Sequence, residues 1–237
     1  MANRTLLLFP KPARPGRVKT RLIGALTAEQ AAELHGAFVE DLAERLHAGA
    51  FETTVAWAVE SWEPIPDGPH PGCSLGFRGL RQEGVDLGQR LFRALVAAAV
   101  SGGPVAAVGS DHPGLPLERF EEAFARIEAG AEVVLGPATD GGYYLIALAA
   151  AAVHPRLFEG IAWSTAGVLA ATLDRCHELG LAADLLAPEH DVDTPDDLRR
   201  LAGSLASGGG ECPRTFALLN RWGWLAAAAA QPTAVAR

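Results

Sequence analysis

Apolar runs and amphipathic stretches alternate along most of the chain. Residues 5–9, 104–109 and 131–136 are almost wholly apolar, which is typical of strands that are buried on both faces of a parallel sheet. Residues 27–47 and 117–129 instead repeat apolar side chains at three- and four-residue spacing, which indicates helices with one face toward the core. Because strands and helices alternate, we predict a single α/β domain whose mostly parallel sheet is flanked by helices.

The remaining elements follow the same alternation. A capping box of Thr27 and Gln30 predicts the start of the helix at 27–47, and Ser164 and Gly180 are predicted to begin and end another helix. Further strands are expected at residues 51–59, 74–80, 143–149 and 181–187, and further helices at 86–100, 164–179 and 194–205. A stretch rich in Pro and Gly, residues 61–72, is expected to form an exposed, mobile loop.

A Ser-Gly break at residues 207–210 sets off the last part of the chain. We predict that residues 1–206 form the α/β domain and residues 207–237 a tail, in which a linker precedes a helix over 213–230. This tail would serve as a lid or as a homodimer contact, and the sequence favours neither role.

Composition excludes several classes of protein. The chain has 237 residues with 49% hydrophobic content, which is enough for one core. Three widely spaced cysteines without a Cys-x-x-Cys pair indicate neither a disulfide framework nor a zinc site. The longest apolar stretch, eleven residues at 143–153, is too short to cross a membrane, so we expect a cytoplasmic protein with no membrane partner. A net charge of −8 argues against a nucleic-acid polymer as partner.

The sign of the charge reverses in residues 9–22. This stretch carries five cations, among them both lysines of the chain, and no acid, which points to a bound anion. It connects a predicted strand to a predicted helix, where backbone N–H groups and a helix N-terminus commonly bind phosphate. A Walker A loop is excluded because Val18 stands where that motif needs glycine, and a surface loop with solvated cations is the alternative. The residues expected to bind phosphate are Lys11, Arg14, Pro15, Gly16, Lys19 and Arg21.

Two aspartates lie at positions suited to a metal site. Asp111, with Ser110 before it, leaves the end of the strand at 104–109, and Asp193 lies just before the helix at 194–205. Ligands of open α/β sheets bind beyond the carboxyl ends of strands. Mg²⁺ takes one or two protein carboxylates together with substrate oxygens and water, so both aspartates suit it. The alternative for Asp111 is that it caps the helix that follows.

A third cluster surrounds Asp140. This residue would act as a general base or bind acceptor hydroxyls, while Gly141 and Gly142 let a substrate approach the backbone before Tyr143. The alternative is a tight Asp-Gly hairpin turn between two strands.

Two further groups of residues can be interpreted either as part of a binding site or as part of a helix cap. Asp86, in a stretch that ends at Gly88, either holds the base or ribose of a nucleotide or forms a capping box with Gln89. Trp163 and Ser164 either form the floor of an acceptor pocket, or Ser164 only caps its helix.

The motifs together resemble a family. Residues 9–22 resemble the Lys-x-Pro-x-Pro-Gly-x-x-Lys-Thr-Arg-Leu signature of a glycosyltransferase-like, uncharacterised transferase family of DUF2064 type. The resemblance covers about residues 4–203 and continues through Gly84-Val-Asp-Leu-Gly88, Gly109-Ser-Asp-His-Pro-Gly-Leu115, Gly136-Pro-Ala-Thr-Asp-Gly-Gly-Tyr-Tyr144 and Asp191-Val-Asp-Thr-Pro-Asp-Asp-Leu198. It implies a GT-A or nucleotide-diphospho-sugar-transferase-like fold, shared with molybdenum-cofactor and phospholactate guanylyltransferases. It also implies that Asp111 is a metal ligand and that Asp193 supplies a second carboxylate.

The sequence thus favours a transferase that uses Mg²⁺ or Mn²⁺ and binds a nucleotide. The preferred hypothesis is nucleotidyl transfer from a nucleoside triphosphate to a small phosphorylated or oxyanion acceptor, with Lys19, Arg14 and Asp140 in catalysis. The alternative is glycosyl transfer from a nucleotide sugar, which needs fewer cations and, in an inverting enzyme, a base such as Asp140. A non-catalytic nucleotide-binding module is the second alternative.

Overall fold

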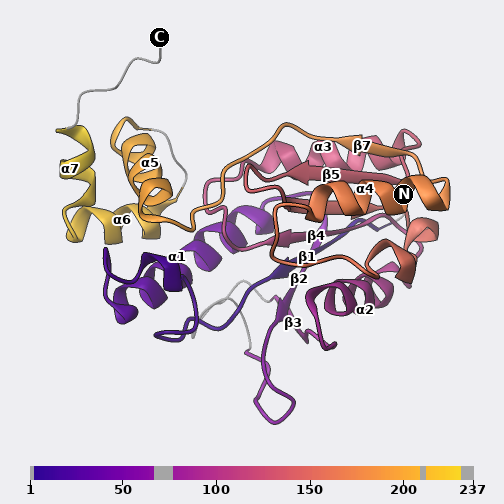
Figure 1. The fold of residues 1–237 in the computed structure, drawn as a ribbon, viewed down its shortest axis with the longest axis horizontal. Coiled ribbons are helices and arrows are strands. Elements are labelled where there is room, and N and C mark those ends of the chain that lie inside the picture. The colour runs from indigo at the N-terminus through magenta and orange to yellow at the C-terminus, as the bar shows by residue number, and fades with distance from the viewer. Residues whose placement is uncertain (1–2, 67–76, 209–211, 231–237) are drawn as a thin grey trace.

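One mixed sheet forms the centre of the molecule (Figure 1). The computed structural model describes residues 3–66, 77–208 and 212–230, and within them seven strands pair in the order β3-β2-β1-β4-β6-β5-β7. Neighbouring strands are parallel except at β6, which runs antiparallel to both β4 and β5. The strands are β1 (Thr5–Phe9), β2 (Glu52–Trp57), β3 (Arg78–Arg81), β4 (Val105–Gly109), β5 (Val133–Pro137), β6 (Tyr143–Leu148) and β7 (Ala183–Leu185).

Helices cover both faces of the sheet, as the sequence predicts. α1 (Ala28–His47) and α3 (Leu117–Glu128) pack on one face, and α2 (Leu87–Ala99) and α4 (Val168–Leu179) pack on the other. Three short 3-10 helices lie between the longer elements: η1 (Thr20–Leu22), η2 (Ala150–Ala152) and η3 (Pro155–Leu157).

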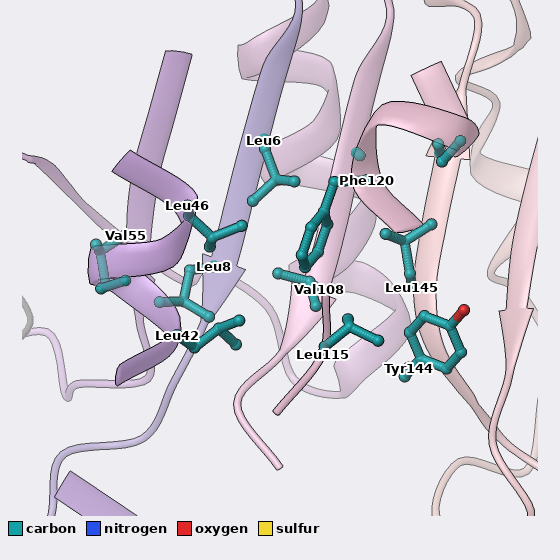
Figure 2. Packing of buried hydrophobic residues seen from close by; sticks show 14 of the residues in the cluster. Leu6, Leu8, Leu42, Leu46, Val55, Val108, Leu115, Phe120, Tyr144 and Leu145 are labelled. Carbon is teal, nitrogen blue, oxygen red and sulfur yellow. The ribbon is translucent and has the colours of Figure 1, made fainter. Parts of the chain in front are cut away.

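Alternation along the strands divides the core into two layers. On β1, Leu6 and Leu8 belong to the cluster under α1 and α3, whereas Leu7 belongs to the cluster under α2 and α4. Figure 2 shows Leu42 and Leu46 of α1 directed toward Leu8. Because β1 is buried on both faces, its sequence is a continuous apolar run with no polar alternation.

The C-terminal helices form a third apolar cluster at one end of the molecule. α5 (Pro195–Ala206), α6 (Pro213–Arg221) and α7 (Trp224–Ala229) pack there against the first half of α1. Asp41 of α1, only 1% exposed, accepts hydrogen bonds from the backbone N–H groups of Arg214 and Thr215 at 3.0 and 2.8 Å. This contact fixes the start of α6 to α1, while the division at residue 206 and the lid or dimer role of the tail stay predictions.

The structure corrects two local predictions. The helix predicted over 213–230 is two helices, because Gly223 adopts a left-handed conformation with φ 77° between them. Ser164 caps no helix: it has φ 65°, and α4 begins at Val168 after Gly167. The strand predicted at 143–149 is confirmed as β6, which is antiparallel to both of its neighbours.

Two other expectations touch residues outside the described ranges. The strand predicted at 74–80 corresponds in part to β3, but residues 67–76 are outside those ranges, and with them much of the loop predicted at 61–72. Among the helices that the structure describes, none has the length and apolar character that crossing a membrane requires.

Candidate active site

A cavity of about 730 Å³ opens at the edge of the sheet where β1, β3 and β4 end. Because β6 is antiparallel, its first residues, Tyr143 and Tyr144, lie at that same edge. The loop after β1, the beginning of α2 and residues 163–168 complete the wall. Open α/β sheets bind their ligands at this edge, so the cavity is the candidate active site.

Lys19 occupies the floor of the cavity. It adopts a left-handed conformation, with φ 46° and ψ 38°, immediately before η1. Its side chain is only 2% exposed, and its Nζ lies 2.5 Å from Asp111 Oδ1 and 3.0 Å from Asp193 Oδ1. The ammonium also donates to the carbonyl oxygen of Val192 at 2.7 Å and lies over the ring of Phe38. Lys19 thus joins three segments that are far apart in sequence.

Lys19 and Asp111 stabilise each other's charged form. Burial disfavours the ammonium, but Asp111 and Asp193 outweigh this effect and raise the pKa of Lys19. Burial likewise disfavours the Asp111 carboxylate, but Lys19 outweighs it and lowers the pKa of Asp111. Both groups are therefore charged at neutral pH.

The Asp111 and Asp193 side chains are suitable ligands for a divalent cation, because both are carboxylates and both are partly exposed. Their carboxylates converge on one ammonium, and their side chains are still 45% and 38% exposed. Asp191 is nearby but binds His112 Nδ1 through its own Oδ1 at 2.8 Å. Within the described residues, no three His, Cys, Asp or Glu side chains form a metal site by themselves. A bound ion would therefore need water and substrate oxygens as further ligands, which is the usual arrangement for Mg²⁺.

The cations predicted in residues 9–22 separate into two groups. Lys11 and Arg21 line the cavity together with Lys19, as does Arg17. Arg14 does not line it, and its Nη1 instead lies 2.8 Å from Glu63 Oε1. Pro15 and Gly16 also lie outside the cavity lining, and Gly16 has φ 71° in the turn that precedes Lys19.

A buried histidine supports this loop from α1. His35 is 3% exposed, and burial lowers its pKa, so its ring is neutral at neutral pH. Its Nε2 lies 3.0 Å from the carbonyl oxygen of Lys11, which requires that Nε2 carries the proton and donates it. This bond fixes the backbone that presents Lys11 to the cavity.

Asp86 and Gly88 lie apart from the main cavity. Asp86 Oδ1 accepts from the backbone N–H of Gln89 at 2.8 Å and so caps α2, which is the structural alternative raised from the sequence. Both residues line a second hollow of about 240 Å³, which shares Trp163 with the main cavity. Ser110 is different, since it is 4% exposed and borders the main cavity beside Asp111.

Asp140, Gly141 and Gly142 form the connection between β5 and β6. Asp140 Oδ1 accepts from the backbone N–H of Gly142 at 2.9 Å, as expected of a hairpin turn, and Asp140 and Gly142 also line the cavity. Gly141 has φ 92°, and a Cβ there would lie 2.2 Å from the carbonyl oxygen of Ala166. The hairpin is therefore packed tightly against the segment at 163–168.

Aromatic rings line this end of the cavity. Tyr143 and Trp163 meet edge to face with ring centroids 6.5 Å apart, and both border the cavity together with Ser164. Burial raises the pKa of Tyr143, so its hydroxyl keeps its proton at neutral pH. Thus the proposed acceptor residues and Asp140 lie together, on the far side of β4 from the cationic loop.

Several lining residues with functional groups were missed by sequence reasoning, Gln82 and Arg90 among them. Gln82 directly follows β3, and Arg90 lies in α2 with its Nε donating to Gly84 at 3.1 Å. The rule of inspecting residues that follow strands would have found Gln82. Arg90 was harder to find, because the only indication was that it lies just after the candidate nucleotide-binding stretch that begins at Gly84.

Comparison with protein families gives one match. A family model described as an uncharacterized protein conserved in bacteria, DUF2064, matches residues 42–165. No protein with a curated description matches the chain.

Solved structures match the whole fold. A candidate nucleotide-diphospho-sugar transferase from Desulfovibrio desulfuricans G20 is 29% identical, with 96% of this chain and 99% of that chain covered and a TM-score of 0.85. A cytidylyltransferase from Leptospira borgpetersenii serovar Hardjo-bovis is 13% identical over 100% of both chains, with a TM-score of 0.58. CMP:2-keto-3-deoxy-manno-octonic acid synthetase, complexed with CTP, is 13% identical over 87% of this chain and 99% of that chain, with a TM-score of 0.54.

The likeness confirms the fold expected from the sequence. The two more distant structures show the fold alone. The expectation of a transferase agrees with the description of the D. desulfuricans protein, which matches almost the entire chain.

Proposed function

The chain belongs to the DUF2064 family of bacterial proteins and has the fold of nucleotide-dependent transferases, and we propose that it transfers a nucleotidyl group from a nucleoside triphosphate. The acceptor would be a small molecule with a phosphate or another oxyanion, and pyrophosphate would leave. The observation that carries this proposal is the position of Lys19 Nζ between Asp111 and Asp193, in a cavity lined by four further cations. Those four are Lys11, Arg17, Arg21 and Arg90.

The cations suit the charge that such a transfer moves. An acceptor oxygen forms a bond to the α-phosphorus, the bond from that phosphorus to the bridging oxygen breaks, and its electron pair leaves with pyrophosphate. Lys11, Arg17 and Arg21 would neutralise the triphosphate and the growing charge on the leaving group. An acceptor that is already ionised has no proton to lose. The five cations of the lining therefore agree with this mechanism.

We further propose that Asp111 and Asp193 hold Mg²⁺ or Mn²⁺. When bound, such an ion neutralises phosphate oxygens and orients the reacting groups. Lys19 holds both carboxylates at the floor of the cavity and keeps that of Asp111 ionised.

Glycosyl transfer from a nucleotide sugar is the second candidate. The description of the D. desulfuricans protein favours it. So does the end of the cavity at β6, where the described lining residues include Asp140, Tyr143 and Trp163 but no lysine or arginine. An aromatic and acidic end of this kind suits a neutral, hydroxyl-bearing acceptor, and an inverting transfer would use Asp140 as its base.

A binding and turnover screen separates these candidates. Nucleoside triphosphates and nucleotide sugars are titrated against the protein with and without Mg²⁺, and pyrophosphate release is followed with phosphorylated acceptors. Mg²⁺-dependent binding of a triphosphate with release of pyrophosphate supports nucleotidyl transfer. A preference for a nucleotide sugar, together with an Asp140→Asn variant that loses turnover but keeps nucleotide affinity, supports glycosyl transfer. Nucleotide binding without any product would indicate a non-catalytic module.

A further inference from the structure

Gln82 is held in one orientation at the end of β3. It is 8% exposed, and its backbone N–H donates to the carbonyl oxygen of Trp57 at 2.9 Å. Its side-chain Nε2 donates to the carbonyl oxygen of Ala56 at 2.7 Å and to that of Pro10 at 3.4 Å. A carbonyl oxygen only accepts hydrogen bonds, so the amide nitrogen must face these two groups. A flipped amide would place its oxygen against both carbonyl oxygens.

The Oε1 atom of Gln82 is consequently the group that faces the cavity. Gln82 is a lining residue, and no described residue donates to this oxygen. The atom is also not among the buried polar atoms that lack a partner, so solvent or a ligand reaches it. The cavity wall thus contains a fixed hydrogen-bond acceptor that does not switch to a donor.

The surroundings of Gln82 suit a flat, apolar ring system. Phe9, Ala58, Leu87 and Leu91 line the cavity near it, from the ends of β1 and β2 and from α2. This end lies on one side of the central strands β1 and β4, whereas Asp140 and Trp163 lie on the other side. Apolar walls with a few oriented polar groups, here Gln82 and Arg90 of α2, recognise the edge of a planar ligand.

We propose that Gln82 reads the nucleobase and selects one that bears an exocyclic amino group. This inference rests on the proposed function, because it takes the phosphates of the nucleotide to lie at the cations and Lys19. An exocyclic group extends beyond the ring and so reaches the recessed Oε1. An amino group donates a hydrogen bond to it, whereas a carbonyl at the same place sets two acceptors against each other. Cytosine, adenine and guanine carry such a group, whereas uracil and hypoxanthine offer the recessed Oε1 only a ring N–H.

Paired nucleotides test this selection on the unmodified protein. Affinities are measured at constant Mg²⁺ for CTP against UTP, GTP against inosine triphosphate, and ATP against inosine triphosphate, with tripolyphosphate as a probe without a base. We expect at least one amino-bearing member to bind about tenfold or more tightly than its counterpart. If tripolyphosphate binds and the two nucleotides of every pair bind with equal affinity, the base selection is wrong while the proposed function stands. Failure of every triphosphate and of tripolyphosphate to bind would overturn the proposed function and this selection with it.

A matched pair of variants locates the effect. Gln82→Met keeps similar volume but removes the acceptor, so the preference should fall to within about twofold while affinity for tripolyphosphate stays unchanged. Gln89→Met is the control, because Gln89 is exposed and outside the main cavity. That variant should keep the full preference. A preference that survives in Gln82→Met would overturn the assignment to this residue.

Discussion

Lys19 and Asp111 are joined across the floor of the cavity, with Nζ 2.5 Å from Oδ1. The pair connects the loop after β1 to the end of β4, the two strands at the centre of the site. The Lys19 side chain is 2% exposed and that of Asp111 is 45% exposed, so the cation lies beneath and the acid is presented to the cavity. Substitution of Lys19 therefore disturbs both the position and the charge of the acid above it.

Lys19→Met is expected to weaken binding of a nucleoside triphosphate by about 10- to 100-fold, the range for losing hydrogen bonds to charged groups. Without the ammonium, Asp111 and Asp193 repel each other and the triphosphate. Isothermal titration calorimetry with each triphosphate measures the change. An unchanged affinity would show that Lys19 is only a structural element of the floor.

Arg17→Gln and Arg14→Gln should differ in effect, although the sequence led us to expect Arg14 in catalysis. Arg17 lines the cavity, so its loss should weaken triphosphate binding about tenfold, the value of one charge-assisted hydrogen bond. Arg14 binds Glu63 outside the lining, so its loss should change affinity by less than about twofold. Parallel titrations measure both variants. A larger loss from Arg14→Gln than from Arg17→Gln would contradict the arrangement of this loop.

Acid should remove the contribution of Asp111 to stability. Lys19 lowers the pKa of Asp111 in the folded protein, so the carboxylate stabilises the fold above its unfolded pKa of about 3.9. This contribution is lost as the pH falls through the lower, folded pKa. The difference in free energy of unfolding between the wild type and Asp111→Asn should therefore shrink from pH 5 toward pH 2. Urea unfolding at several pH values measures it, and a constant difference would contradict the ion pair.

Gly141→Ala should destabilise the protein more than Gly102→Ala. Both glycines have positive φ, 92° and 76°, and both substitutions incur the cost of a left-handed residue, about 1–2 kcal/mol. Only at Gly141 does the new Cβ meet the carbonyl oxygen of Ala166, at 2.2 Å, whereas nothing lies within 4 Å at Gly102. Overpacking adds about 1–3 kcal/mol, and each kcal/mol lowers Tm by roughly 2–4 °C. Thermal unfolding compares the variants, and equal shifts would contradict the tight packing of the hairpin.

Local signals in the sequence predicted much of the fold. The apolar run at β1 reflects burial on both faces, and the capping box of Thr27 and Gln30 marks the start of α1 as predicted. The helix predicted at 194–205 also begins where expected, with Thr194 as the cap of α5. These features depend on residues that are adjacent in sequence, and their physical causes are therefore visible without the fold.

The direction of β6 and the contacts between residues far apart in sequence were harder to predict. The apolar run Tyr143–Leu148 is the same whether the strand runs parallel or antiparallel, so only the Asp-Gly turn raised as an alternative at Asp140 indicated the reversal. Arg14 looked equivalent to its neighbours because its partner, Glu63, lies beyond β2. The rule of inspecting residues that follow strands led to Asp111, which lines the cavity. The rule does not apply to Tyr143, which begins β6 and reaches the cavity because that strand runs in the opposite direction.

The floor of the cavity also dictates when the cavity can first be completed during synthesis. On the ribosome, Lys19 precedes the carbonyl of Val192 and the carboxylate of Asp193 by 173 and 174 residues. At about 5–20 residues per second, translation of the intervening chain lasts roughly 9–35 s. A nascent chain that stops short of Asp193 consequently has only the part of the floor that Lys19 and Asp111 supply.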